Sequence, residues 1–215
     1  MKIYPLLIIL LIFACKEKPE AQTVVEKPRV ETKKAVIADS AMVVSARAEA
    51  SKIGTEILKM GGNAFDAMIA TNMALALTYP NAGNLAGGGF MVYRTQYGEI
   101  GSLDYREKAP MAATKNMYLD KDGNVIPNKS SIGAMSVAVP GTVAGMFAAH
   151  EKFGSLPMEV ILKPVIELAK KGYIITEKEA EELEMYIPYF EEINGETILY
   201  TENLKAGDTL KNLAL

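Results

Sequence analysis

The chain has 215 residues, 49% of them hydrophobic and 23% charged, which is enough to bury one substantial core. Its net charge of -3 provides no basic field that would attract a phosphate backbone, which argues against nucleic-acid binding. Cys15 is the single cysteine and His150 the single histidine, which excludes an internal disulfide and a Cys/His zinc cluster. We therefore expect no bound metal.

The first fifteen residues have the pattern of an export signal. Lys2 gives a positive start, and residues 6–13 form an unbroken apolar run that is shorter than the ~20 residues of a membrane-spanning helix. The Ile-Phe-Ala-Cys sequence at 12–15 resembles a bacterial lipobox. We predict a lipoprotein signal peptide over residues 1–15, with lipidation at Cys15. The alternative is an unmodified cysteine behind an ordinary cleavage site.

The following residues differ sharply in composition from the rest of the chain. Residues 16–38 are rich in Lys, Glu and Pro with few large apolar side chains, so they are predicted to be a disordered tether. As a random coil, this tether would hold the folded part roughly 25 Å from the lipid head groups. The predicted protein is exported, periplasmic or on the cell surface, and anchored to a bacterial membrane, with its folded domain over residues 39–215.

Two helices are expected at the start of the folded part. Apolar residues recur at helical spacing over 46–60, and charged residues, Arg47 among them, occupy the other side. The glycines at 61–62 end this helix, and Asn63 can cap the next one. That second helix, from 64 to about 77, has almost no charge, so we expect protein around most of its surface.

A glycine-rich loop at 81–89 leads from this helix into a β-hairpin. Residues 90–93 and 100–105 are predicted strands, and Arg106 follows the second strand. The order helix, glycines, strand matches neither a P-loop nor a dinucleotide-binding fingerprint. The favoured interpretation is that glycine permits a close backbone approach or a positive φ, and direct contact with a ligand is the alternative.

Three more helices are expected toward the end of the chain. One begins at Thr142 and runs to about residue 152, and another spans 158–171. A capping box of Thr176 and Glu179 begins a third, which we expect to run toward residue 186. Since Thr142 and Thr176 open helices, neither is favoured as a nucleophile.

Two other features are better explained by structure than by catalysis. Residues 120–124 form a plain surface turn, because they lack the ligand spacing of a calcium-binding EF-hand. His150 lies beside charged residues on its helix, so we expect it to be partly exposed and not to act as a base.

Several segments, in order along the chain, closely resemble the N-terminal region of gamma-glutamyltranspeptidases. They are residues 61–67, 79–91, 104–110 (Asp-Tyr-Arg-Glu-Lys-Ala-Pro), 139–145 (Val-Pro-Gly-Thr-Val-Ala-Gly), 171–173 and 207–210. Agreement of several motifs in sequence order is much more specific than a single pattern. The resemblance covers roughly residues 42–210.

The resemblance implies an α/β (α+β layered) N-terminal-nucleophile hydrolase, a four-layer α-β-β-α sandwich of which only the N-terminal portion is present. Family members cut themselves into two subunits, and a new N-terminal threonine attacks the gamma-glutamyl amide of glutathione. Water or an amino acid or peptide then accepts the glutamyl group, and no cofactor is needed. The family's threonine lies beyond this chain, together with the rest of the large subunit and the small subunit. No catalytic residue is therefore expected here, and the chain alone should be inactive.

Arg106 corresponds in this resemblance to the family's arginine that binds the alpha-carboxylate of the glutamyl group. A guanidinium can bind a carboxylate through two parallel N–H bonds, and ends of strands often display pocket residues. The competing interpretation is a structural ion pair with Asp104 or Glu107. At the level of function, the alternatives are a related cephalosporin acylase, a poly-gamma-glutamate depolymerase or a non-catalytic, vestigial lipoprotein.

Overall fold

The computed structural model describes residues 35–82 and 85–215. Contacts divide the chain into two units, Met1–Ile37 and Ala38–Leu215, and the described helices and strands all belong to the second unit. The predicted signal peptide, Cys15 and most of the predicted tether lie outside the described residues.

The end of the first helix and the start of the second lie where the predicted capping signals place them. Helix α1 spans Ala48–Lys59, and Gly61 follows it with φ +94°. The N–H of Gly62 donates to the carbonyl of Ile57 over 3.0 Å, which closes the last turn as a Schellman motif. Helix α2 spans Ala64–Thr78 and begins with a capping box in which Asn63 is the N-cap.

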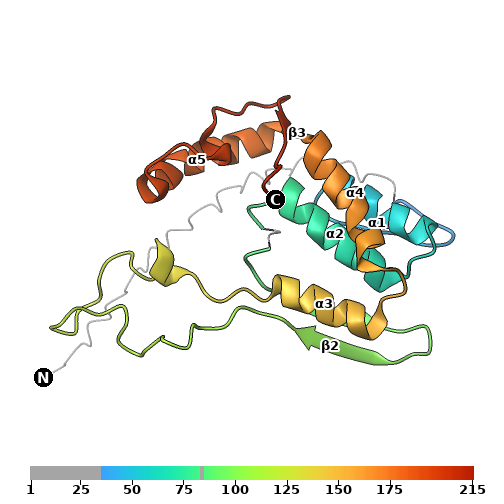
Figure 1. The fold of residues 1–215 in the computed structure, drawn as a ribbon, viewed down its shortest axis with the longest axis horizontal. Helices are drawn as coiled ribbons and strands as arrows, with labels where there is room; N and C mark the ends of the chain where they lie inside the picture. Colours follow the sequence, from blue (N-terminus) through green and yellow to red (C-terminus); the bar gives the residue numbers. More distant parts are fainter. Residues whose placement is uncertain (1–34, 83–84) are drawn as a thin grey trace, which may run out of the picture. The chain divides into compact units, whose positions relative to one another are not determined.

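Helix α2 is the centre of the core, as its lack of charge predicts. It packs against α1, α3 (Thr142–Phe153) and α4 (Met158–Lys171), and most of its residues are buried (Figure 1). Close packing with α1 depends on Gly54, where an added Cβ would overlap the hydroxyl of Thr71. The bounds of α4 are those predicted from the sequence.

Strands β1 (Phe90–Arg94) and β2 (Ile100–Asp104) form an antiparallel hairpin, with Phe90 opposite Asp104. Because side chains alternate between the two faces of a strand, Met91 and Tyr93 face the helices. The Tyr93 ring packs on two rings, those of Phe65 in α2 and Phe153 in α3, at centroid distances of 5.7 and 4.7 Å. These contacts fix the hairpin against the helices.

The chain between the hairpin and α3 has few regular elements. It contains the 3-10 turn η1 (Ala134–Ser136) and the predicted surface turn, in which the Asp120 carboxylate accepts bonds from the N–H groups of Asp122 and Asn124, each 2.9 Å long. These bonds, with that from Asn124 foremost, lower the pKa of Asp120.

The C-terminal elements are β3 (Tyr173–Ile174), α5 (Glu177–Asn194), η2 (Leu199–Thr201) and β4 (Thr209–Leu210), with β3 and β4 paired antiparallel. The predicted capping box of Thr176 and Glu179 is present. The predicted end near residue 186 is wrong, because α5 continues through Pro188. A proline removes one helical hydrogen bond without ending this helix, and Gly195, with φ +67°, supplies the left-handed residue that does.

The mixture of helices with short antiparallel strands places this unit in the α+β class. Across the described residues, no helix combines the length and the apolar character needed to cross a membrane.

Candidate functional site

The segment that carries Arg106 leaves the end of β2 and is held by backbone hydrogen bonds on both sides. On one side, the Tyr105 N–H donates to the carbonyl of Gly89 over 3.0 Å. On the other side, Lys108 and Val139 exchange two bonds, of 3.0 and 2.8 Å. Arg106 therefore projects from a backbone that is fixed immediately before and after it.

Glycines let two other segments of the same chain approach this segment closely. A Cβ added at Gly88 would lie 2.7 Å from the backbone nitrogen of Glu107 and 2.8 Å from the Cα of Arg106. One added at Gly141 would overlap the carbonyl oxygen of Tyr105. Close backbone approach, the favoured interpretation of the glycine-rich loop, is therefore confirmed at Gly88.

The N-terminus of α3 packs against the same segment. The Gly87 carbonyl accepts hydrogen bonds from the N–H groups of Gly141 and Thr142, at 2.9 and 3.0 Å. The ring of Tyr105 packs directly against Gly145 and is partly buried. Burial raises the pKa of Tyr105.

The side chain of Arg106 is largely free of this scaffold. It is 62% exposed, and its Cζ lies 5.4 Å from the centroid of the Phe90 ring. Its Nε lies 3.7 Å from Oε2 of Glu107, whereas Asp104 accepts a bond from the backbone N–H of Arg106. The competing ion pair with Glu107 is thus present, but an exposed pair of this length contributes little to stability and leaves most of the Arg106 side chain open to solvent.

Two other polar residues have structural roles. The carboxylate of Asp66 is fully buried and accepts bonds from the backbone N–H of Asn63 and from the N–H and hydroxyl of Ser155. Nε2 of His150 lies 2.7 Å from the carbonyl oxygen of Leu156, toward which it can act only as a donor. His150 is partly buried and tied to this carbonyl, so it has a structural partner.

A buried cluster around Arg47 was not predicted. The sequence places Arg47 on the polar side of a helix, but the residue instead precedes α1 and is only 9% exposed. Its guanidinium pairs with Glu49 and Glu179 and stacks over Tyr173, 5.2 Å from the ring centroid. Burial alone would lower the pKa of Arg47, but hydrogen bonds to Glu179 and Glu49 outweigh it and raise the pKa.

Among the described residues, no three His, Cys, Asp or Glu side chains come together as a metal-binding group. A family model described as gamma-glutamyltranspeptidase matches residues 50–215. The chain belongs to the gamma-glutamyltranspeptidase family.

Curated members of the gamma-glutamyltranspeptidase family resemble this chain over most of its length. It is 51% identical over 146 residues to the glutathione hydrolase proenzyme of Pseudomonas sp. (strain A14), covering 68% of this chain and 25% of that protein. The corresponding Escherichia coli (strain K12) proenzyme is 42% identical over 181 residues, covering 81% and 31%. The chain thus spans between a quarter and a third of the length of these relatives.

Solved structures show the gamma-glutamyltranspeptidase fold. The Helicobacter pylori gamma-glutamyltranspeptidase superposes with a TM-score of 0.77 at 39% identity, over 83% of this chain and 52% of that one. A cephalosporin acylase from Bacillus halodurans gives a TM-score of 0.64 at 21% identity over 83% of this chain and 37% of that one, a likeness of fold alone. The predicted N-terminal-nucleophile hydrolase fold of α+β class is confirmed.

Proposed function

We propose that this chain supplies the carboxylate-binding arginine of a gamma-glutamyl hydrolase and transferase. The supporting observation is Arg106, whose guanidinium is 62% exposed while its backbone is hydrogen-bonded on both sides. A fixed backbone with an open guanidinium suits two-point binding of a carboxylate, which needs little rearrangement on binding. The substrates are glutathione or other gamma-glutamyl compounds.

The reaction in this proposal is acyl transfer, with the nucleophile in a part of the longer relatives that this chain does not cover. The hydroxyl oxygen of a threonine forms a bond to the gamma-carbonyl carbon, the amide C–N bond breaks, and the leaving amine takes the proton that the hydroxyl gives up. Water or the amine of an amino acid then attacks the ester and releases the glutamyl group. Arg106 holds the alpha-carboxylate throughout and takes no part in proton transfer.

The test requires a whole enzyme, which we would build by joining residues 38–215 to the part of the Pseudomonas sp. relative that follows its match. Arg106→Ala should raise the KM for a gamma-glutamyl amide about 10- to 100-fold, because charge-assisted hydrogen bonds of roughly 1.5–3 kcal/mol are lost. Arg94→Ala is the matched control, since Arg94 is an exposed arginine of the same hairpin. Steady-state kinetics of both variants would measure the difference.

An unchanged KM in Arg106→Ala would contradict the proposed role. The same variant separates the gamma-glutamyl enzyme from the acylase alternative, because an acylase that acts on a side-chain acyl group has no alpha-carboxylate for Arg106 to hold. The closer identity to glutathione hydrolases, 51% and 42% against 21% for the cephalosporin acylase, supports the gamma-glutamyl substrate. The 215-residue chain alone serves as the reference and should not turn over glutathione. Turnover by it would contradict the proposal that the nucleophile lies outside this chain.

A further inference from the structure

Phe90, the first residue of β1, lies on the same face of the hairpin as Arg106. It is paired with Asp104 across the two strands, and directly opposite side chains of an antiparallel pair project from one face. Bonds between Tyr105 and Gly89 continue the ladder past β2. Since side chains alternate along an extended chain, Arg106 returns to the face of Asp104. Phe90, Asp104 and Arg106 are all exposed, which agrees with this placement.

The contact between Phe90 and Arg106 joins a well-held ring to a flexible cation. Cζ of Arg106 lies 5.4 Å from the centroid of the Phe90 ring, which is within the range of a cation–π interaction. The backbone of Phe90 is fixed by its strand pairing, and its side chain has few rotatable bonds. The long side chain of an arginine has much more rotamer freedom. The ring therefore restricts the positions that the guanidinium can take.

The Phe90 ring orients the guanidinium without competing for it. A second contact, of 3.7 Å from Nε of Arg106 to Oε2 of Glu107, places a carboxylate beside the cation. That carboxylate has the same charge as the substrate group that Arg106 is proposed to bind, so the two compete. The ring is uncharged and attracts the cation through its π face, so the N–H donors stay available to a carboxylate.

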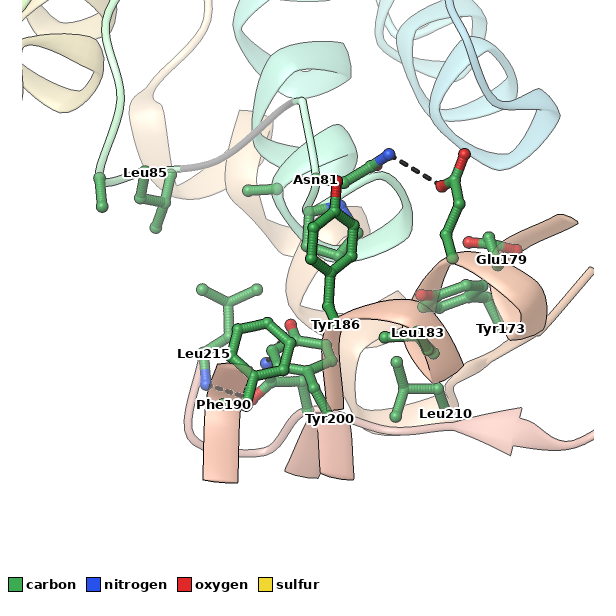
Figure 2. A pocket seen from close by; sticks show the side chains of 15 residues that line it. Asn81, Leu85, Tyr173, Glu179, Leu183, Tyr186, Phe190, Tyr200, Leu210 and Leu215 are labelled. Atoms are coloured by element: carbon green, nitrogen blue, oxygen red, sulfur yellow. Dashed lines mark hydrogen bonds between the residues drawn. The ribbon is translucent and has the colours of Figure 1, made fainter. Parts of the chain in front are cut away.

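An apolar cavity elsewhere in this unit does not contribute to the arrangement. It has a volume of about 410 Å³, and Figure 2 shows the rings of Tyr186, Phe190 and Tyr200 among its walls. Among the residues that the structure describes, none from the hairpin lines this cavity. The contacts that orient Arg106 are thus those at the end of the hairpin.

We propose that Phe90 is a positioning residue for gamma-glutamyl substrates, whose ring holds the Arg106 guanidinium in the orientation that binds the alpha-carboxylate. This inference rests on the proposed function, because Phe90 acts only through Arg106 and makes no bond to the substrate. A guanidinium that the ring already restricts loses less freedom when the carboxylate binds, so the substrate binds more tightly.

The test uses the joined enzyme described above. Phe90→Leu removes the π face and keeps an apolar side chain, whereas Phe90→Tyr keeps the ring. Phe90→Leu should raise the KM for a gamma-glutamyl amide about 3- to 10-fold, because the cation–π interaction is lost, and should change kcat less than about twofold. Phe90→Tyr should keep the KM within about twofold of the wild type. Steady-state kinetics measure both constants.

Further variants separate positioning from packing. Val92→Ala is the matched control and should leave the KM unchanged, because Val92 is an exposed apolar residue on the same face of the same strand. In the Arg106→Ala background, Phe90→Leu should have no further effect on the KM, because the ring then has no guanidinium to hold. Phe90 is 63% exposed, so its replacement leaves no buried cavity, and circular dichroism checks that each variant is folded. Phe90→Met is a second ring-free variant and should reproduce the rise.

Three results would overturn the inference: an unchanged KM in Phe90→Leu and Phe90→Met, an equal rise in Phe90→Tyr, or an equal rise with and without Arg106. If Arg106→Ala raises the KM and the ring-free variants do not, the role of Phe90 fails and the proposed function stands. An unchanged KM in Arg106→Ala would instead contradict the proposed function, and the role of Phe90 with it.

Discussion

Three glycines, Gly88, Gly141 and Gly145, make room for the backbone and ring beside Arg106. At each of them an added Cβ would meet Tyr105, Arg106 or Glu107 closer than atoms normally approach. Sequence alone indicated that glycine was needed in the loop before β1, but did not show which atoms pass there. The atoms that these glycines approach belong to residues 105–107, directly after β2, which lie far in sequence from Gly141 and Gly145.

Gly145→Val should destabilise the protein by about 1–3 kcal/mol, because the new side chain overlaps the base of the Tyr105 ring, which has little freedom to move. Ala144→Val on the exposed side of the same helix is the control for placing a β-branched side chain in this helix, and the propensity change of Gly145→Val itself favours the helix. Urea denaturation followed by circular dichroism measures both. Equal stability of the two variants would show that Tyr105 moves aside without cost.

At the scale of elements, Arg47 links three parts of the structure. It precedes α1, pairs with Glu179 in α5, donates to the carbonyl of Ile174 in β3 over 3.4 Å and stacks on Tyr173. Its side chain is only 10% exposed and that of Glu179 12%, so the pair is screened little by water.

Arg47→Met should lower the free energy of unfolding by about 3–5 kcal/mol, because it leaves the Glu179 carboxylate buried without its cation. Lys178→Met is the control, since Lys178 is 77% exposed and its pair with Glu182 should contribute less than about 1 kcal/mol. Chemical denaturation of the two variants provides the comparison. If Arg47→Met lowered the free energy of unfolding no more than Lys178→Met does, the ion pair of Arg47 with Glu179 would be hydrated.

How well the elements could be predicted depends on how local their signals are. The capping boxes at Asn63 and Thr176 involve residues three apart, and both helices begin where these boxes predict. The position of Arg106 after β2 also follows from local hairpin and motif signals. The pairing of Arg47 with Glu179 joins segments distant in sequence, and periodicity contains no information about such contacts.

At the scale of the whole molecule, stability should fall in alkaline solution. Burial, and next the charge of Glu179, raise the pKa of Tyr173 above its ordinary value of 10.0. A group whose pKa is higher in the folded state contributes stability that is complete below the unfolded pKa. As the pH rises above 10, the unfolded chain releases this proton more readily than the folded chain, so the folded state loses stability.

Tyr173→Phe keeps the ring that Arg47 stacks on and removes the ionising hydroxyl. Above pH 10, the free energy of unfolding of Tyr173→Phe should therefore decline less steeply than that of the wild type. Near neutral pH, the two proteins should differ less in this free energy. Urea denaturation over a series of alkaline buffers measures this. The raised pKa of Tyr105 leaves some alkaline dependence in both proteins. Parallel pH profiles would show that Tyr173 titrates normally.

The proposed membrane anchor also concerns the whole molecule. We expect Cys15→Ser to abolish incorporation of radiolabelled palmitate in a bacterial host and to move the protein from the membrane fraction to the soluble fraction, because the serine cannot carry the thioether-linked lipid. Labelling followed by fractionation measures both effects. Equal labelling of wild type and Cys15→Ser would contradict the lipoprotein prediction.

The carbonyl of Gly87, which accepts from Gly141 and Thr142, has a consequence for charge selectivity. Two of the N–H groups at the start of α3 are therefore already bonded within the protein, so fewer of them are open to an incoming anion. In the proposed function, discrimination between a carboxylate and its uncharged amide then depends mainly on the guanidinium of Arg106. A lysine at position 106 would retain attraction but lose the planar fork, making selectivity sensitive to ionic strength.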